Sequence, residues 1–381
     1  MTDDRTLPRL GLALSLLMFM LTGAASAGER WSAERAKQWY ARQPWLVGCN
    51  YTPRTAINQL EFWQAETFDP KTIDQELGWA HDVGLNTLRV YLHHVPHRQD
   101  AEGFYKRIDR FLGIAHTRGI RVMFVLLDDC WDPNPRPGKQ REPRPHVHNS
   151  GWVQCPGTDV LGKPDRHDEM KPYVAGVIGR FRDDPRVLAW DLYNEPGNGN
   201  GANYPGQEPP DKAKLSLLLL RKAFDWALEV RPDQPITVGL WAGDWSDPQK
   251  TSPINATCIA RSDIMTFHSY SAAAGFKARA RATMALGRPV ICTEYLNRPG
   301  GCTFQALLPY MKENGIGAIH WGFVTGKIQT QYPWSSWRKT LTAEPKTWFH
   351  DLLRPDGTPF DPEEVKLLRK LSGRGTRLPR E

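Results

Sequence analysis

Two glutamates are the side chains of this 381-residue chain best suited to acid/base and nucleophilic chemistry. Glu195 lies in the segment 190–196, Trp-Asp-Leu-Tyr-Asn-Glu-Pro, and Glu294 follows the apolar run Val-Ile-Cys-Thr at 290–293. A pair of carboxylic acids can cleave a glycosidic bond, because one protonates the leaving oxygen while the other attacks the anomeric carbon. With retention of configuration, this chemistry needs the two carboxyl groups about 5 to 5.5 Å apart.

The elements that must position these acids follow from the hydrophobic pattern. Short β-branched runs alternate with longer amphipathic segments, which is typical of βα repeats and a parallel sheet. Eight repeats without a composition break favour one α/β domain, a single (β/α)8 TIM barrel, over an open doubly wound sheet. We predict strands at 45–50, 87–91, 121–127, 187–193, 236–240, 263–267, 290–293 and 318–322. We predict helices at 72–83, 103–118, 168–181, 213–230, 272–286, 303–313 and 362–371.

Polar and aromatic side chains gather at the ends of these strands. In such a barrel the core is apolar, so polar groups that converge on the C-terminal mouth indicate a catalytic site. Strands four and seven face each other across the barrel, which allows both glutamates to point into one mouth. The other strand-end groups are Asn50, Tyr51, Arg89, Tyr91, Asp128, Asp129, Asn194, Trp241, His268, Tyr270, Tyr295 and Trp321.

Several of these motifs, in this strand order, resemble the clan A glycoside hydrolases and are most similar to family 5, the cellulase and mannanase type. The resemblance covers about residues 44–325 and rests on the whole set of motifs. A lone Asn-Glu-Pro turn, or a lone glutamate at a strand end, is common in other proteins. The motifs are Asn194-Glu195-Pro196, Glu294, His268-Ser269-Tyr270, Arg89 and Trp321.

The resemblance implies a role for each matching residue. Glu195 would be the general acid/base, and Glu294 would be the nucleophile, with Arg89 and the Tyr270 hydroxyl stabilising its carboxylate. Asn194 would bind the 2-hydroxyl of the attacked sugar, and Trp321 would form the floor beneath it. His268 would hold the acid/base or a neighbouring side chain in place, the alternative being a packed histidine at a strand end.

Two segments depart from the family pattern. Family 5 enzymes usually carry a histidine at the end of strand three, where this chain has Asp128 and Asp129. We expect Asp129 to bind sugar hydroxyls, while one aspartate of the pair has the alternative of capping the loop. After strand eight, Lys327 precedes a Trp-rich loop. It either contacts a carboxylated or heavily hydroxylated sugar or is an ordinary surface lysine.

The N-terminus is typical of a secretory signal peptide. Arg5 and Arg9 precede an apolar run from Leu10 to Leu21, and the small residues at 25–27 suit cleavage after Ala27. We therefore predict a signal peptide at 1–27, a catalytic domain at 28–372, a basic flexible tail at 373–381 and a secreted or periplasmic protein. The alternative is an uncleaved membrane anchor, since acidic residues at 3 and 4 weaken the positive charge of the segment.

Cysteines and histidines offer two further kinds of site. Export permits disulfides, and Cys130 and Cys155 bracket one Pro-rich and His-rich stretch, so they are the preferred pair, with free thiols as the alternative. The remaining cysteines lie at 49, 258, 292 and 302, and no spacing resembles a zinc site. The histidines at 93, 94, 97, 146 and 148 lack reliable ligand spacing. The family resemblance implies no cofactor, and we predict neither a metal nor a cofactor.

The formal net charge of +7 is scattered along the chain, which indicates a solvated surface and not a nucleic-acid interface. Fifteen tryptophans suit a carbohydrate binder, because sugar C–H faces stack on large aromatic rings. We therefore expect a carbohydrate substrate, no nucleic acid, no membrane association of the mature form and no obligate protein partner.

The favoured function is retaining hydrolysis of a β-linked polysaccharide or oligosaccharide by double displacement. One alternative is an exo-acting β-glycosidase or a transglycosylase of the same clan. A second is a non-catalytic carbohydrate-binding barrel, against which the presence of both glutamates counts. A third is a barrel enzyme of unrelated chemistry, such as a metal-dependent lyase, and the strand ends lack the ligand clusters that this would need.

Overall fold

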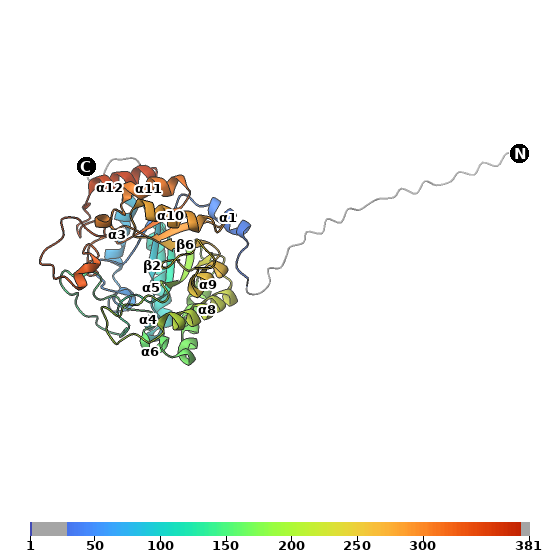
Figure 1. Ribbon diagram of the computed structural model, residues 1–381, viewed down its shortest axis with the longest axis horizontal. Helices are drawn as coiled ribbons and strands as arrows, with labels where there is room; N and C mark the ends of the chain where they lie inside the picture. The colour runs from blue at the N-terminus through green and yellow to red at the C-terminus, as the bar shows by residue number, and fades with distance from the viewer. Residues whose placement is uncertain (2–28, 375–381) are drawn as a thin grey trace.

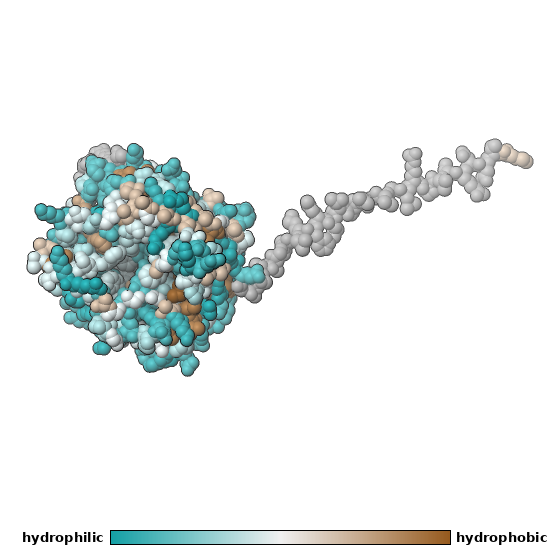
Figure 2. Space-filling view, in the orientation of Figure 1, coloured by the Kyte–Doolittle hydropathy of each residue, from teal (hydrophilic) through white to brown (hydrophobic). Residues whose placement is uncertain are grey.

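The computed structural model describes residue 1 and residues 29–374. Residues 2–27 of the predicted signal peptide and residues 375–381 of the predicted tail therefore lie outside the described residues. Among the residues described, no helix has both the length and the apolar character that crossing a membrane requires. The face of the molecule in Figure 2 is mostly hydrophilic, with small apolar patches between the polar areas.

Eight parallel strands form the centre of the fold, with helices packed outside them (Figure 1). The barrel order is β5-β4-β3-β2-β1-β8-β7-β6. In the register, Asn50 on the first strand pairs with Arg89 on the second and Trp321 on the eighth, so the first and last strands are neighbours. The strands are β1 (Val47–Asn50), β2 (Thr87–Tyr91), β3 (Arg121–Asp128), β4 (Val187–Asn194), β5 (Ile236–Thr237), β6 (Met265–His268), β7 (Val290–Glu294) and β8 (Gly317–Trp321).

The barrel closes between β5 and β6 through a single residue. Leu240 forms a parallel bridge with Phe267, its N–H donates to the carbonyl of Thr266, and its own carbonyl accepts from the N–H of His268. The predicted strand at 236–240 is therefore shorter in the structure. Only Ile236 and Thr237 pair with β4, after which the chain turns toward β6.

All seven predicted helices are present, with ends displaced by at most three residues. Side-chain caps account for several of their starts: Asp69 accepts from the N–H of Thr72, Thr303 from that of Ala306, and Asp361 from that of Glu363. The long helices on the barrel are α3 (Pro70–Asp82), α5 (Ala101–Thr117), α7 (Lys171–Arg180), α8 (Lys212–Val230), α10 (Ala273–Met284), α11 (Phe304–Glu313) and α12 (Pro362–Leu371).

Five further helices were not predicted, and two of them are nine residues long. The helix α1 (Ala33–Ala41) packs Trp39 in one apolar cluster with barrel residues such as Met123 and Ile319, and so it covers barrel core residues. The helix α9 (Pro253–Arg261) connects β5 to β6 and buries only Asn255 and Cys258. The shorter helices are α2 (Gln59–Trp63), α4 (His94–Gln99) and α6 (Thr158–Leu161), with 3-10 turns at Pro164–Met170, Arg298–Gly300 and Trp334–Trp337.

The long loops after β3 and β8 pack on each other at the C-terminal end of the barrel. The rings of Trp131 and Trp337 stack with centroids 5.2 Å apart and an interplanar angle of 11°. The N–H of His148 donates to Ser336 Oγ at 2.9 Å, and that of Asn149 donates to the carbonyl of Ile328 at 2.7 Å. These contacts make one wall around the barrel mouth.

Candidate active site

A cavity of about 550 Å³ opens at the C-terminal end of the strands. Its lining includes residues that follow or end four different strands: Glu195 after β4, His268 on β6, Glu294 on β7 and Trp321 on β8. The predicted convergence of strand-end groups is therefore present in the structure. Of the predicted site residues, Asn194, Glu195, His268, Tyr270, Glu294 and Trp321 line the cavity.

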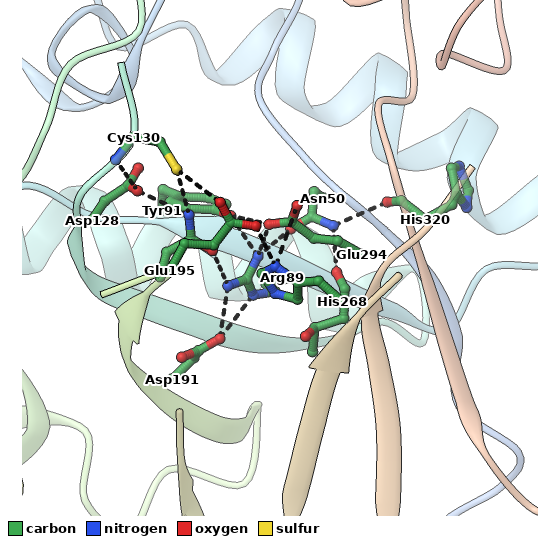
Figure 3. Close-up of polar contacts among 12 residues, drawn as sticks. Asn50, Arg89, Tyr91, Asp128, Cys130, Asp191, Glu195, His268, Glu294 and His320 are labelled. Atoms are coloured by element: carbon green, nitrogen blue, oxygen red, sulfur yellow. Dashed lines mark hydrogen bonds and ion pairs between the residues drawn. The ribbon is translucent and has the colours of Figure 1, made fainter. Parts of the chain in front are cut away.

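The two glutamates meet at one histidine. His268 Nδ1 lies 2.7 Å from Glu195 Oε1 and 3.6 Å from Glu294 Oε2. An oxygen of each carboxyl group and a ring nitrogen of His268 all lie within 4.8 Å of one another. Figure 3 shows both carboxyl groups turned toward this common point above Arg89. This upper limit on the distance between the two oxygens is close to the carboxyl separation of about 5 to 5.5 Å in retaining glycosidases and well below the roughly 6.5 to 9.5 Å of inverting ones.

Glu195 is held by neighbours on both carboxyl oxygens. Asn198 Nδ2 donates to its Oε2 at 2.6 Å, and the Cys130 thiol lies 3.4 Å from the same oxygen. Burial raises the pKa of Glu195, but the hydrogen bonds from His268, Asn198 and Cys130 outweigh it, and the pKa lies below its ordinary value.

The backbone at Glu195 is itself unusual. Its φ of +46° lies in the left-handed region, which non-glycine residues adopt rarely. Gly197, two residues later, also has a positive φ of +83°, and a Cβ there would lie 3.3 Å from the Ala213 backbone. The tight turn after β4 therefore fixes where the Glu195 side chain leaves the strand.

Glu294 accepts hydrogen bonds from three side chains. Arg89 Nη1 donates to its Oε1 at 2.8 Å, the Tyr91 hydroxyl donates to the same oxygen at 2.9 Å, and the Tyr270 hydroxyl donates to Oε2 at 2.7 Å. The predicted contacts of Arg89 and Tyr270 with Glu294 are therefore present. Tyr91 follows Arg89 by two residues on β2, and this spacing places both on one face of a strand.

Arg89 lies beneath the glutamates and is fully buried. Its Nε and Nη2 both donate to Asp191 Oδ2, at 2.9 and 2.8 Å, and its Nη1 also donates to Asn50 Oδ1 at 2.8 Å. A buried cation is stable only when paired and hydrogen-bonded, and here two carboxylates and several polar oxygens surround it. Figure 3 shows these contacts converging on the guanidinium.

Asn194 is oriented on both sides of its amide. Its Oδ1 accepts from Arg89 Nη2 at 2.8 Å, and its Nδ2 donates to Asp128 Oδ1 at 2.9 Å and to Cys130 Sγ at 3.3 Å. Burial raises the pKa of Asp128 to about 7, against the opposing hydrogen bonds from Asn194 and Trp152. The Asp128 carboxyl thus positions Asn194 and is not turned into the cavity.

The structure does not bring Asp129, predicted as a sugar-binding residue, into the cavity. Its side chain is 0% exposed, and its carboxyl oxygens accept from the Tyr193 hydroxyl, the N–H of Gly197 and the Ser216 hydroxyl. Burial raises the pKa of Asp129. The charge of the nearby Lys212 and these three hydrogen bonds oppose the rise. Neither aspartate of the pair is a lining residue of the cavity, because both are used to brace the loops after β3 and β4.

The side-chain contacts of Cys130, Cys155 and Lys327 bear on two other predictions from the sequence. The preferred disulfide is absent: all six cysteines are free, and Cys130 contacts Glu195 while Cys155 contacts His94. Lys327 Nζ forms an ion pair with Glu61 Oε1 at 2.6 Å, which favours the ordinary surface lysine over a sugar contact.

Among the described residues, two groups have the composition of metal ligands. One is the Glu195, His268 and Glu294 cluster described above. The other is His93, His94 and Cys155, which are buried beside the site. Both ring nitrogens of His93 are occupied, one by the N–H of Val95 and the other by the carbonyl of Gln154. A metal in the second group would have to break these bonds.

Aromatic rings line the cavity on several sides. Trp321, predicted as the sugar floor, is 8% exposed and packs edge-on against Tyr91 and Trp152. Trp241 donates from its indole nitrogen to the carbonyl of Pro196, the residue after Glu195. Sequence reasoning missed Cys130, Asp191 and Asn198 as site residues, and it named Tyr91 only among the strand-end groups, without a role.

Comparisons with known proteins bear on the family and the fold of this chain. The family model Cellulase (glycosyl hydrolase family 5) matches residues 54–325. A putative mannan endo-1,4-beta-mannosidase 4 from Arabidopsis thaliana is 23% identical over 241 residues, or 60% of this chain. That alignment spans about half of the relative, 54% of its length.

Two solved structures share the fold. GH5_18 from Streptomyces cattleya, in complex with Manb1-4GlcNAc, has a TM-score of 0.59 at 16% identity, covering 89% of this chain and 83% of that one. The endo-beta-1,4-mannanase from Thermotoga petrophila has a TM-score of 0.55 at 14% identity, with coverage of 88% and 77%. At such identities the likeness concerns the fold alone.

Proposed function

Because this chain belongs to glycosyl hydrolase family 5 and is a glycoside hydrolase, we propose that it retains anomeric configuration, with Glu195 as general acid/base and Glu294 as nucleophile. The observation that carries the proposal is the separation of the two carboxyl groups. Oxygens of Glu195 and Glu294 lie within 4.8 Å, which suits direct attack on the sugar and leaves too little room for an intervening water.

In the first step a Glu294 oxygen attacks the anomeric carbon while Glu195 gives its proton to the glycosidic oxygen. The bond between the anomeric carbon and the glycosidic oxygen breaks. The product is a sugar ester of Glu294 and a free leaving group. In the second step Glu195 takes a proton from water, the water oxygen attacks the anomeric carbon, and Glu294 leaves as a carboxylate. Asn194, fixed by Arg89 and Asp128, is placed to bind a hydroxyl of the reacting sugar.

We propose a β-1,4-linked mannan or a related β-linked polysaccharide as the substrate. The Arabidopsis relative is named as a mannan endo-1,4-beta-mannosidase and the Thermotoga structure as an endo-beta-1,4-mannanase, and the Streptomyces structure holds Manb1-4GlcNAc. Assays on mannan, glucan, xylan and galactan identify the backbone sugar. Product lengths from a defined oligosaccharide would separate internal from terminal cleavage.

The test is a panel of β-linked mannan, glucan, xylan and galactan together with aryl β-glycosides, assayed with wild type, Glu294→Gln and Glu195→Ala. We expect Glu294→Gln to lose about 10³-fold or more of activity. Glu195→Ala should retain most of the ester-forming step on aryl glycosides with good leaving groups, and added azide should then accelerate turnover. Proton NMR of the first product should show the starting anomer. Inversion, or full activity of Glu294→Gln, would contradict the proposal.

A further inference from the structure

A second hollow lies directly outside the central cavity. It has a volume of about 370 Å³ and is called the outer hollow below. Its lining consists of two tryptophans, two cations and two neutral polar residues, and four of the six also line the central cavity. A chain of sugars bound in the central cavity can therefore continue into it. The six residues are Trp131, Asn203, Trp334, Ser335, Arg338 and Lys339.

Trp334 provides an open aromatic face in this hollow. It is 41% exposed, and the only other exposed large apolar side chains among the described residues are Met1 and Leu218. Its ring is nonetheless fixed, because it packs edge-on against Tyr270 with centroids 5.0 Å apart and against Phe349 at 4.8 Å. Tyr270 in turn contacts Glu294. A rigid, exposed indole next to the reacting groups is the kind of surface on which a pyranose ring stacks.

The charge of the outer hollow is positive. No described residue forms an ion pair with Arg338 or with Lys339, and Lys339 is exposed. The two carboxyl groups that line the joined cavities are those of Glu195 and Glu294, which face His268 and Arg89. The guanidinium of Arg338 therefore offers several donors for which the protein supplies no acidic partner. A planar guanidinium is well matched to carboxylate, sulfate and phosphate oxygens.

Arg279, the other arginine of the central cavity, is differently placed. Its Nη1 donates to the carbonyl of Trp241 at 3.3 Å, and its guanidinium lies over the ring of Trp245 at 4.9 Å from the centroid. It is thus already engaged by the protein. This difference provides an internal comparison between two arginines of one cavity.

We propose that the outer hollow is a subsite for a sugar unit that carries a negative charge, so that the preferred substrate is an anionic β-glycan. Trp334 stacks on the ring of this unit, and Arg338, with Lys339 beside it, binds its acidic group. The inference rests on the proposed function, which it extends by naming a substrate class. The shared chemistry is an oxyanion on the sugar, supplied by a uronic acid or by a sulfate ester.

The experiment uses β-1,4-linked manno- and gluco-oligosaccharides in three forms: neutral, oxidised at C6 to carboxylates, and O-sulfated. Binding is measured by calorimetry to the Glu294→Gln variant, and hydrolysis is measured with the wild type. In the Glu294→Gln background we expect the anionic forms to bind about 5- to 20-fold more tightly than the neutral ones at low salt, the gain of one partly solvated charged contact. The preferred anionic form identifies the acidic group.

Matched variants assign the effect to single residues. Arg338→Gln should abolish the preference and leave neutral binding within about twofold. Trp334→Ala should weaken binding of all forms, because stacking does not depend on charge. Lys37→Gln, which removes an exposed charge on α1, and Arg279→Gln should both keep the preference.

Three results would overturn the proposed subsite. The first is equal affinity for charged and neutral forms in the Glu294→Gln protein with no other substitution. The others are an unchanged preference in Arg338→Gln and loss of the preference in Arg279→Gln alone. Failure of the proposed function is distinguishable from these, because it would appear as absent hydrolysis of every neutral and charged form while the binding measurements still stand.

Discussion

His268 Nδ1 lies 2.7 Å from Oε1 of Glu195 in a contact that is almost completely shielded from solvent. Burial by itself raises the pKa of Glu195, and the hydrogen bond and charge of His268 are the largest of the influences that bring it below its ordinary value. The acid/base role proposed for Glu195 therefore depends on this partner as well as on the position of the carboxyl group.

Replacing His268 with alanine should move the pH dependence of the reaction. Without the histidine, burial dominates, the pKa of Glu195 rises, and the protonated acid persists to higher pH. The alkaline limb of kcat/KM, which reports the free enzyme, should therefore shift upward, while kcat falls about 10- to 100-fold. His268→Asn, which keeps a donor near the Nδ1 position, should shift less, and His116→Asn on the exposed side of α5 is the control. An unmoved alkaline limb would mean that His268 is a packing residue.

Arg89→Met should damage both stability and activity, for separable reasons. The substitution leaves the buried Asp191 carboxylate without its cation, which costs about 3 to 5 kcal/mol in the free energy of unfolding. It also removes a donor from Glu294. The double variant Arg89→Met with Asp191→Asn removes the orphaned charge, so it should recover part of the stability in urea unfolding and none of the activity. Recovery of both would show that Arg89 supports only the fold.

The sequence predicted the strands and the carboxylates well for a physical reason. A strand of a parallel barrel is buried on both faces, so it appears as a short apolar run, and the first polar residue after that run lies at the mouth. Glu294 and Asn194 follow from this pattern. Arg89 and Tyr91 follow from the two-residue spacing along β2.

The remaining site residues depended on loop geometry that no periodicity encodes. Asp129 follows its strand as a sugar-binding residue would, but the turn at Gly197 brings a backbone donor to its carboxyl group. Asn198 reaches Glu195 only because the same turn has a left-handed residue. The helix α9 has few buried residues, so its amphipathic pattern is weak.

Asp351→Asn should stabilise the protein at high pH and have little effect at low pH. Burial raises the pKa of Asp351 to about 7, so the folded protein favours the protonated form. The folded state keeps this proton while the unfolded state has lost it, so stability falls as pH rises from about 4 to 7 and is level above that. The amide of Asp351→Asn does not ionise, so the variant avoids this loss of stability. We expect a gain of roughly 2 to 4 kcal/mol at pH 8 in denaturant unfolding and a vanishing difference at pH 4. A gain that is equal at both values would exclude titration of Asp351 as the cause.

The six cysteines should behave as free thiols. A thiol-specific reagent in denaturant should report six equivalents without prior reduction, and a reducing agent should leave Tm unchanged. Burial, with Asp128 and Glu195 close by, raises the pKa of the Cys130 thiol, so its alkylation in the folded state should be slow at neutral pH. A count of four equivalents would mean that two of the cysteines form a disulfide. Cys155→Ser serves as the control, since it should lower the count by one and not by two.

Asp129→Asn distinguishes most directly between what the sequence suggested and what the structure contains. A sugar-binding aspartate would raise KM on replacement and leave the stability of the free protein alone. The Asp129 carboxyl is instead surrounded by donors from Tyr193, Gly197 and Ser216, at 2.8, 2.6 and 2.5 Å. In Asp129→Asn, an NH2 group replaces one of the two carboxyl oxygens and faces a hydrogen-bond donor of the protein. The lost hydrogen bond costs about 1 to 3 kcal/mol in unfolding free energy. Since Gly197 lies in the turn that orients Glu195, kcat should fall modestly while KM stays within about twofold. A several-fold rise in KM at unchanged stability would instead mean that Asp129 reaches the substrate after all.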